Sequence, residues 1–327
     1  MQIDTTATVG MGTRVELIGV VCLMLLNGVC QMCLHRIFLS AIVTVGFWST
    51  SCLGQTVNIA ELVDGKIKQL AGGFKFTEGP AADDRGNVYF TDIPNARILV
   101  WTIGGELKTH REKSGKANGL YFTPKGSLLA CEGGARRITS QSPQGKVKIL
   151  TETYGEKKYN SPNDLWLDAW GGIYFTDPRY GSQEGTEQDG FHVYYISPKG
   201  QKVTRVIDDH VKPNGIIGTA DNKTLYVADA GGNKTYAYRI TGPGEISNKK
   251  LFCESGSDGM TLDHAGNLYL TTSSIRVFNS AGKDLGSIAV PEGPANVTFG
   301  GKNYSTLFIT AKTGLYSIKM KVHGDGR

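Results

Sequence analysis

The sequence predicts an all-β protein, a six-bladed β-propeller, on three observations. A short phrase recurs six times between Glu78 and the C-terminus, with its first residues 38 to 51 positions apart. Each copy joins a polar lead residue to a run in which β-branched and aromatic residues, which strands favour, are common. Turn-forming stretches such as residues 83–86 separate the runs, and no helical apolar period follows Gln55. Strand-and-turn repeats of roughly 40–50 residues are typical of propellers.

The six copies follow one another without a linker rich in proline or serine, so residues 55–327 are expected to form one domain. In chain order the copies are Glu78 with residues 86–92, Asn118 with 126–130, Asn163 with 172–177, Asn214 with 224–229, Asp258 with 266–271 and Asn296 with 305–310. Residues 57–70 precede the first copy and residues 315–322 follow the last. One of these segments is expected to complete a blade begun by the other, which would remove an open sheet edge.

The first 54 residues differ in kind from the repeat. Residues 37–48 form a largely apolar run without a charge, after Arg36 and before a small-residue stretch that ends at Gly54. A run of about twelve residues is too short to span a bilayer and fits the central region of a signal peptide. We therefore expect residues 1–54 to be an N-terminal extension and signal peptide, with the true start at Met32. The alternative is two membrane helices joined at residues 35–36.

Charge and cysteine content narrow the classes of partner. The net charge is +5, and the lysine pairs are scattered along the sequence rather than clustered with aromatic residues. This pattern argues against a nucleic-acid-binding surface. Cys131 and Cys253 are the cysteines that follow the leader, and we expect two free buried thiols, although an exported location permits a disulfide. The expected protein is periplasmic or secreted, has no stable membrane span once mature, and is a monomer or a dimer.

The lead residues predict a polar ring at one place, because a propeller directs the start of each innermost strand toward a central channel. Glu78, Asn163, Asn214 and Asp258 together supply two carboxylates and two amide oxygens. Such oxygen donors suit a divalent cation, Ca²⁺ first, with Mg²⁺, Mn²⁺ or Zn²⁺ as alternatives. For Asn118 and Asn296, a role in forming a turn explains the residue type as well as a functional role does.

A cation in the channel would polarise a carbonyl group and lower the pKa of a bound water. Asp258, or Asp164 beside Asn163, would then serve as the general base. The sequence after the leader has no Gly-x-Ser-x-Gly motif, so nothing supports a serine hydrolase.

The phrases that carry the lead residues resemble the SMP-30/gluconolactonase/LRE-like family over nearly all of residues 60–320. They are Thr77-Glu78-Gly79-Pro80, Ala117-Asn118-Gly119-Leu120, Asn160-Ser161-Pro162-Asn163-Asp164, Phe175-Thr176-Asp177-Pro178-Arg179-Tyr180-Gly181, Pro213-Asn214-Gly215 and Ser257-Asp258-Gly259-Met260. The resemblance implies a six-bladed propeller that holds a divalent metal in its channel and hydrolyses sugar lactones. It places metal ligands on Glu78, Asn214 and Asp258, puts Asn163 at or near the metal, and makes Asp258 the base.

This chain departs from the family pattern at two points, which bear on substrate identity. Residues 131–134 read Cys-Glu-Gly-Gly where bacterial members often carry a histidine after Cys-Glu, and Ser161 stands where animal members have arginine. The candidates for substrate contact are Asn118, Asn163, Arg136, Arg179 and Tyr180.

The expected function is metal-dependent hydrolysis of a small sugar lactone to the open hydroxy acid. A non-enzymatic propeller that binds a sugar or a partner is one alternative, since fold does not fix function. A broader esterase or phosphotriesterase-like hydrolase is another.

Overall fold

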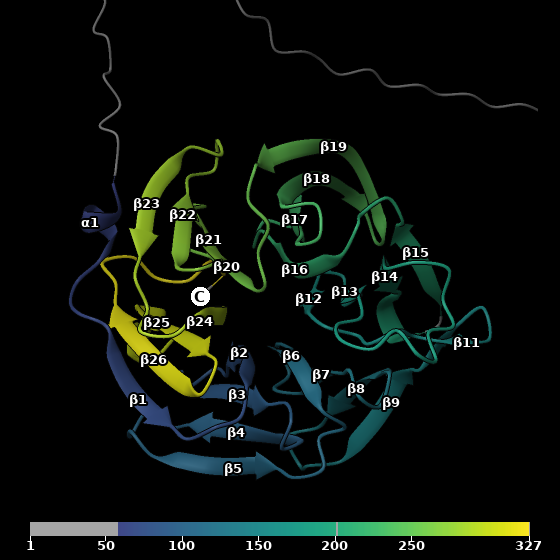
Figure 1. Ribbon diagram of the computed structural model, residues 1–327, viewed down its shortest axis with the longest axis horizontal. Coiled ribbons are helices and arrows are strands. Elements are labelled where there is room, and N and C mark those ends of the chain that lie inside the picture. Colours follow the sequence, from purple (N-terminus) through teal and green to yellow (C-terminus); the bar gives the residue numbers. More distant parts are fainter. Residues whose placement is uncertain (1–57, 201, 327) are drawn as a thin grey trace, which may run out of the picture. The chain divides into compact units, whose positions relative to one another are not determined.

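The computed structural model describes residues 58–200 and 202–326, so the predicted leader lies outside the described residues. Six four-stranded antiparallel sheets stand around a central axis (Figure 1). The predicted all-β six-bladed propeller is confirmed. None of the helices in the described part of the chain reaches the length and apolarity that a membrane crossing requires.

The strands of each blade follow the chain from the axis outward. The first three blades are β2 (Thr77–Ala82), β3 (Val88–Asp92), β4 (Arg97–Trp101) and β5 (Leu107–Arg111); β6 (Ala117–Phe122), β7 (Leu128–Glu132), β8 (Arg137–Gln141) and β9 (Val147–Thr151); and β12 (Leu165–Leu167), β13 (Ile173–Asp177), β14 (His192–Ile196) and β15 (Val203–Ile207).

The next blades continue the same order. They are β16 (Pro213–Gly218), β17 (Thr224–Asp229), β18 (Lys234–Gly242) and β19 (Glu245–Cys253); β20 (Met260–Leu262), β21 (Leu268–Thr271), β22 (Ile275–Phe278) and β23 (Asp284–Ile288); and β24 (Pro294–Gly300), β25 (Thr306–Ala311), β26 (Gly314–Lys319) and β1 (Lys68–Gly72). The remaining elements are α1 (Ile59–Leu62), the hairpin of β10 (Thr153–Tyr154) and β11 (Lys157–Lys158), and two 3₁₀ turns at Pro198–Gly200 and Lys302–Tyr304.

Burial falls from the inner strands of a blade to its outer strand. The second strands, such as β13 and β25, are buried at every position, whereas β5 and β9 are exposed along most of their length. Neighbouring blades are joined by apolar clusters, one of which packs Trp166 and Tyr174 of the third blade against Leu225 and Val227 of the fourth. Cys131 and Cys253 are buried and free, as expected.

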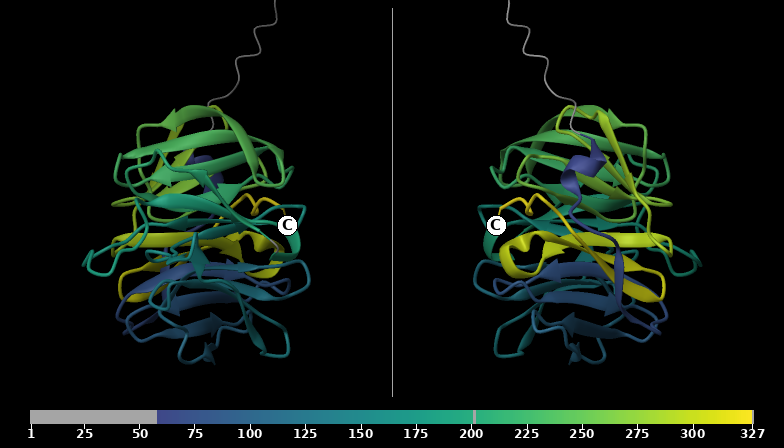
Figure 2. Two further views of the ribbon diagram at one scale, coloured as in Figure 1. Left: turned by 90° about the vertical axis from the view of Figure 1, so that its right-hand side faces the viewer. Right: turned by 90° about the vertical axis from the view of Figure 1, so that its left-hand side faces the viewer.

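The last blade is closed by the N-terminal strand of the propeller. β1 pairs with β26 in an antiparallel register that sets Gln69 opposite Tyr316. This confirms the expectation that the segments flanking the repeat share a blade. α1, which precedes β1, lies beside β23 of the fifth blade, and Figure 2 shows it at the side of the propeller.

Successive innermost strands approach each other closely at the axis. In four blades the residue after the lead is glycine, and an added Cβ at Gly79 would lie 1.9 Å from the carbonyl oxygen of Asn118. At Gly259 it would lie 1.9 Å from Cγ of Asn296. The pairing of β2 also shifts register between Glu78 and Ala81, a bulge of the kind found beside active sites.

We expect Gly79→Ala to destabilise the propeller more than Gly145→Ala does. Both positions have positive φ, +48° and +87°, so both variants carry a similar backbone strain. Gly145 has no atom within 4 Å of its added Cβ, whereas Gly79 meets the next strand. The extra cost at Gly79 should be about 1–3 kcal/mol, the usual range for overpacking. Urea unfolding of the two variants measures the difference, and equal midpoints would contradict the close contact.

Candidate active site

The six lead residues converge at the axis from the starts of the innermost strands. Glu78, Asn118, Asn214 and Asn296 lie within β2, β6, β16 and β24, while Asn163 and Asp258 lie two residues before β12 and β20. Glu78 and Asn214 are each 2% exposed, and Asp258 is partly exposed. Within the predicted ring, Asp258 interacts with Glu78 and Asn214, and Asn296 interacts with Glu78.

A carboxylate at the end of the second strand positions the lead residue in three blades. It accepts hydrogen bonds from the backbone N–H groups two and three positions before that lead residue, at 2.7 to 3.3 Å. Asp92 does this for Glu78, Asp177 for Asn163 and Asp229 for Asn214. In these three blades the aspartate at the end of the second strand thus fixes the loop that enters the channel.

The Asn214 amide is held in one orientation by two acceptors. Its Nδ2 donates to Oδ1 of Asp258 at 2.6 Å and to the hydroxyl of Tyr180 at 2.7 Å. Both of its N–H protons are therefore used. Its Oδ1 is buried with no hydrogen-bond partner among the described residues. A buried amide oxygen without a partner is costly, so this atom points to a ligand.

The two carboxyl groups of the ring interact strongly. Burial first, and then the charge of Asp258, hold the pKa of Glu78 well above its usual value. Burial also raises the pKa of Asp258 to about 6, against hydrogen bonds from Asn214 and Glu78 that lower it. Two carboxylates this close cannot both ionise cheaply without a cation.

Asn296 has a role that the sequence left open between function and a turn. Its side chain lies against Glu78 and Asp164, and hydrogen bonding to it lowers the pKa of both carboxyls. The sequence offered a signal for this role, because Asn296 occupies the lead position of the sixth copy. The oxygen of Asn118, another lead residue, is buried without a partner in the described part of the chain.

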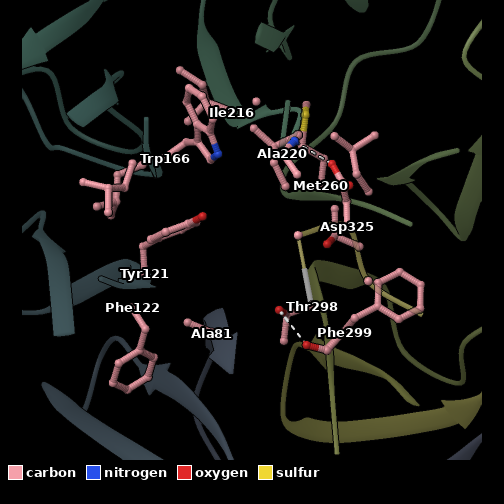
Figure 3. A pocket seen from close by; sticks show the side chains of 18 of the residues that line it. Ala81, Tyr121, Phe122, Trp166, Ile216, Ala220, Met260, Thr298, Phe299 and Asp325 are labelled. Carbon is pink, nitrogen blue, oxygen red and sulfur yellow. Dashed lines mark hydrogen bonds between the residues drawn. The ribbon is translucent and has the colours of Figure 1, made fainter. Parts of the chain in front are cut away.

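Asp164 directly follows the lead residue Asn163. It occupies the position that glycine takes in four of the other copies, and it lines a cavity of about 420 Å³ at the far end of the channel. Figure 3 shows this cavity, which none of Glu78, Asn214 and Asp258 lines. Burial raises the pKa of Asp164 to about 7. Of the two bases that the sequence proposed, Asp258 is thus the one beside Asn214 and Tyr180.

Arg136 and Arg179 hydrogen-bond to loop residues on either side of Asn163 in the sequence. Arg136 donates to the carbonyl of Tyr159 and to Oε1 of Glu187, the latter at 3.1 Å. Arg179 donates to the carbonyls of Asn160, Ser182 and Glu184 at 2.7 to 3.2 Å. These guanidinium groups are engaged with the protein, so their contact with substrate stays a prediction.

The donor atoms of the ring match those that a divalent cation prefers. No group of three His, Cys, Asp or Glu side chains suited to a metal occurs in residues 58–200 and 202–326. The ring offers instead the two neighbouring carboxyl groups of Glu78 and Asp258 and the side-chain oxygen of Asn214, which has no partner among the described residues. Carboxylate and amide oxygens are the donors that Ca²⁺ and Mg²⁺ prefer.

The fold and the ring define a propeller whose candidate site lies at the mouth of its central channel. Residues 76–313 match the SMP-30/Gluconolactonase/LRE-like region. The chain belongs to this family, as its motifs indicated.

Relatives with named activities span most of the chain. A gluconolactonase of Zymomonas mobilis is 28% identical over 79% of this chain and 82% of its own length. A lactonase of Staphylococcus aureus is 30% identical over 65% of this chain and 69% of its own. A solved gluconolactonase structure from Xanthomonas campestris covers 80% of this chain and 92% of its own, with 29% identity and a TM-score of 0.75.

We expect the metal-free protein to lose stability as the pH rises from about 4 to about 7. The folded pKa values of Asp258, Asp164 and Asp177, about 6, 7 and 7, all lie above the value of 3.8 for an unfolded aspartate. Their contribution to stability is complete below pH 4 and is lost as they ionise. Thermal unfolding in a chelator across this range measures the effect. A melting temperature that rises over the same interval would contradict the burial of these carboxyls.

Proposed function

We propose that this chain is an enzyme that hydrolyses the ester bond of a small sugar lactone, in the manner of a gluconolactonase. The observation that carries the proposal is the Asn214 amide, fixed by Asp258 and Tyr180 so that its buried oxygen faces no protein partner. The named activities of the relatives support the reaction class. The product would be the open hydroxy acid.

Glu78, Asn214 and Asp258 would hold a divalent cation, Ca²⁺ first, with Asn163 beside them. When bound, the cation would polarise the lactone carbonyl and offset the charge of the two carboxylates. Metal dependence is supported by the donor set and by the raised pKa values of Glu78 and Asp258.

Asp258 is proposed as the general base. Its carboxylate is partly exposed at the ring. A bound cation would favour the ionised form of this carboxylate, which is the form that accepts a proton. It would take a proton from the water that attacks the carbonyl carbon. The ring C–O bond then breaks, and the alkoxide that leaves takes up a proton to become the hydroxyl of the product.

Tyr180 is proposed as a positioning residue. Half of the residue is exposed, but its hydroxyl points into the protein, where desolvation and then the charge of Asp258 raise its pKa. The hydroxyl thus stays protonated while it accepts from Asn214. Lys212 lies 4.9 Å from the centre of the Tyr180 ring, within the range of a cation–π contact. The ring is thus held beside the site, and its hydroxyl proton is available to an incoming oxygen.

The leader over residues 1–54 supports export of the mature domain. Fractionation of cells that produce the full chain would test this: the mature domain should appear outside the cytoplasm, and its retention there would contradict export.

Asp258→Asn and Glu78→Gln are each expected to abolish lactone hydrolysis while the fold persists. Removal of a general base lowers rates by about 10²- to 10⁴-fold. Proton release from glucono-lactone, with and without a chelator, measures the activity. Asp284→Asn makes the same chemical change in the outer strand β23, where Asp284 binds Arg276, and should leave the rate unchanged. Normal turnover by Asp258→Asn would remove Asp258 from the mechanism.

Tyr180→Phe is expected to weaken metal binding while the fold persists. Loss of one hydrogen bond of about 1 kcal/mol corresponds to about a fivefold rise in the dissociation constant. Calorimetric titration with Ca²⁺ measures this without reference to activity. Tyr236→Phe removes a hydroxyl elsewhere and should bind as the parent does. An unchanged dissociation constant for Tyr180→Phe would show that the orientation of the Asn214 amide does not depend on the Tyr180 hydroxyl.

A further inference from the structure

The cavity at the far end of the channel has walls in which aromatic and apolar side chains stand among polar groups. It lies between the innermost strands of several blades, with a volume of about 420 Å³, in the range of small-molecule sites. Tyr121, Trp166 and Met260 are among the side chains that line it (Figure 3). Trp166 stacks on Tyr174 with their ring centres 5.8 Å apart, so this wall is fixed.

The charged residues that line the cavity are all acidic. Its lining includes Asp164, Asp168 and Asp325 but no Lys, Arg or His from the described residues. The Asp168 carboxylate is already engaged, because it accepts from the N–H of Gly172 and from the hydroxyl of Tyr195, each at 2.7 Å. Asp164 lies at the end nearest the ring. Of the two remaining carboxyl groups, Asp164 is buried and its Oδ1 accepts from the N–H of Leu165 at 2.9 Å, so the second, Asp325, is the charge that a ligand in the cavity would meet.

The C-terminal segment fixes the second of these charges in place. Oδ2 of Asp325 accepts from the backbone N–H of Ala220 at 2.7 Å, and the N–H of Asp325 donates to the carbonyl of Leu262 at 3.0 Å. The carboxylate is thus tied to the fourth and fifth blades rather than free to swing into solvent. Its position in the lining is a built feature of the fold.

We propose that this cavity binds a small organic cation with an apolar body, such as a quaternary ammonium compound. Aromatic faces attract such a cation. Burial of its apolar body against the walls of the cavity would remove that body from water. Asp325 complements its charge.

This cavity adjoins the candidate active site, because its lining includes the lead residue Asn296 and Asp164 but none of Glu78, Asn214 and Asp258. The proposal stands whether or not the chain hydrolyses lactones.

Calorimetric titration of the full chain with three probes tests the proposal. The probes are benzyltrimethylammonium, benzyl alcohol and benzoate, which share an aromatic body and differ in charge. We expect the cation to bind at least about tenfold more tightly than the neutral probe, and benzoate to bind most weakly. Asp325→Asn, in which the side-chain oxygen can still accept from Ala220, should weaken the cation several-fold and leave benzyl alcohol unchanged.

Two control variants separate the cavity from the ring. Asp284→Asn makes the same change on the outer strand β23 and should bind all three probes as the parent does. Asp258→Asn should retain the cation. The proposal is overturned if the three probes bind alike, if Asp325→Asn binds the cation as the parent does, or if Asp258→Asn or added Ca²⁺ abolishes cation binding. Circular dichroism of each variant confirms that the fold is kept.

Discussion

Close contact between successive innermost strands at the axis is the constraint on which the rest of the molecule depends. At Gly79, Gly119 and Gly215 backbone atoms of the next blade lie where a Cβ would stand, and at Gly259 the Asn296 side chain does. The lead side chains are therefore brought together by backbone packing rather than by attraction between them. Where the copy has Asp164 in place of glycine, a carboxylate occupies that position and faces the far cavity. One substitution within the repeat thus gives the two ends of the channel different chemistry.

The ring stores electrostatic strain that the packing of the blades sustains. Burial raises the cost of ionising both Glu78 and Asp258, the charge of Asp258 adds to that cost at Glu78, and hydrogen bonds from Asn296 to Glu78 and from Asn214 to Asp258 relieve part of it. Binding sites often keep such unfavourable arrangements, because the free energy that they cost in the empty protein is recovered when the ligand binds. Here the apolar clusters between blades provide the stability that this arrangement consumes.

The fold could be predicted from the sequence because each blade repeats the same local signals, including the strand run and the turn after it. The sharing of the last blade could also be predicted, since an unpaired sheet edge has a clear physical cost. The converging ring followed from the register of the lead residues. The bond from Asn214 to Tyr180 could not be predicted, because it joins residues from two blades through a loop conformation that no period encodes. The hydrogen bonds from Arg136 and Arg179 to backbone carbonyls could not be predicted either, because they also depend on loop conformation.

The pairing of β1 with β26 has a consequence for how the protein folds. Gln69 and Tyr316 are neighbours in space but lie at opposite ends of the domain sequence. Because contacts between residues so distant in the chain form slowly, the final closing step should come late in folding. Until then, the last blade presents an unpaired strand edge to other molecules. A chain emerging from the ribosome, or crossing a membrane, would remain vulnerable to aggregation until both ends meet.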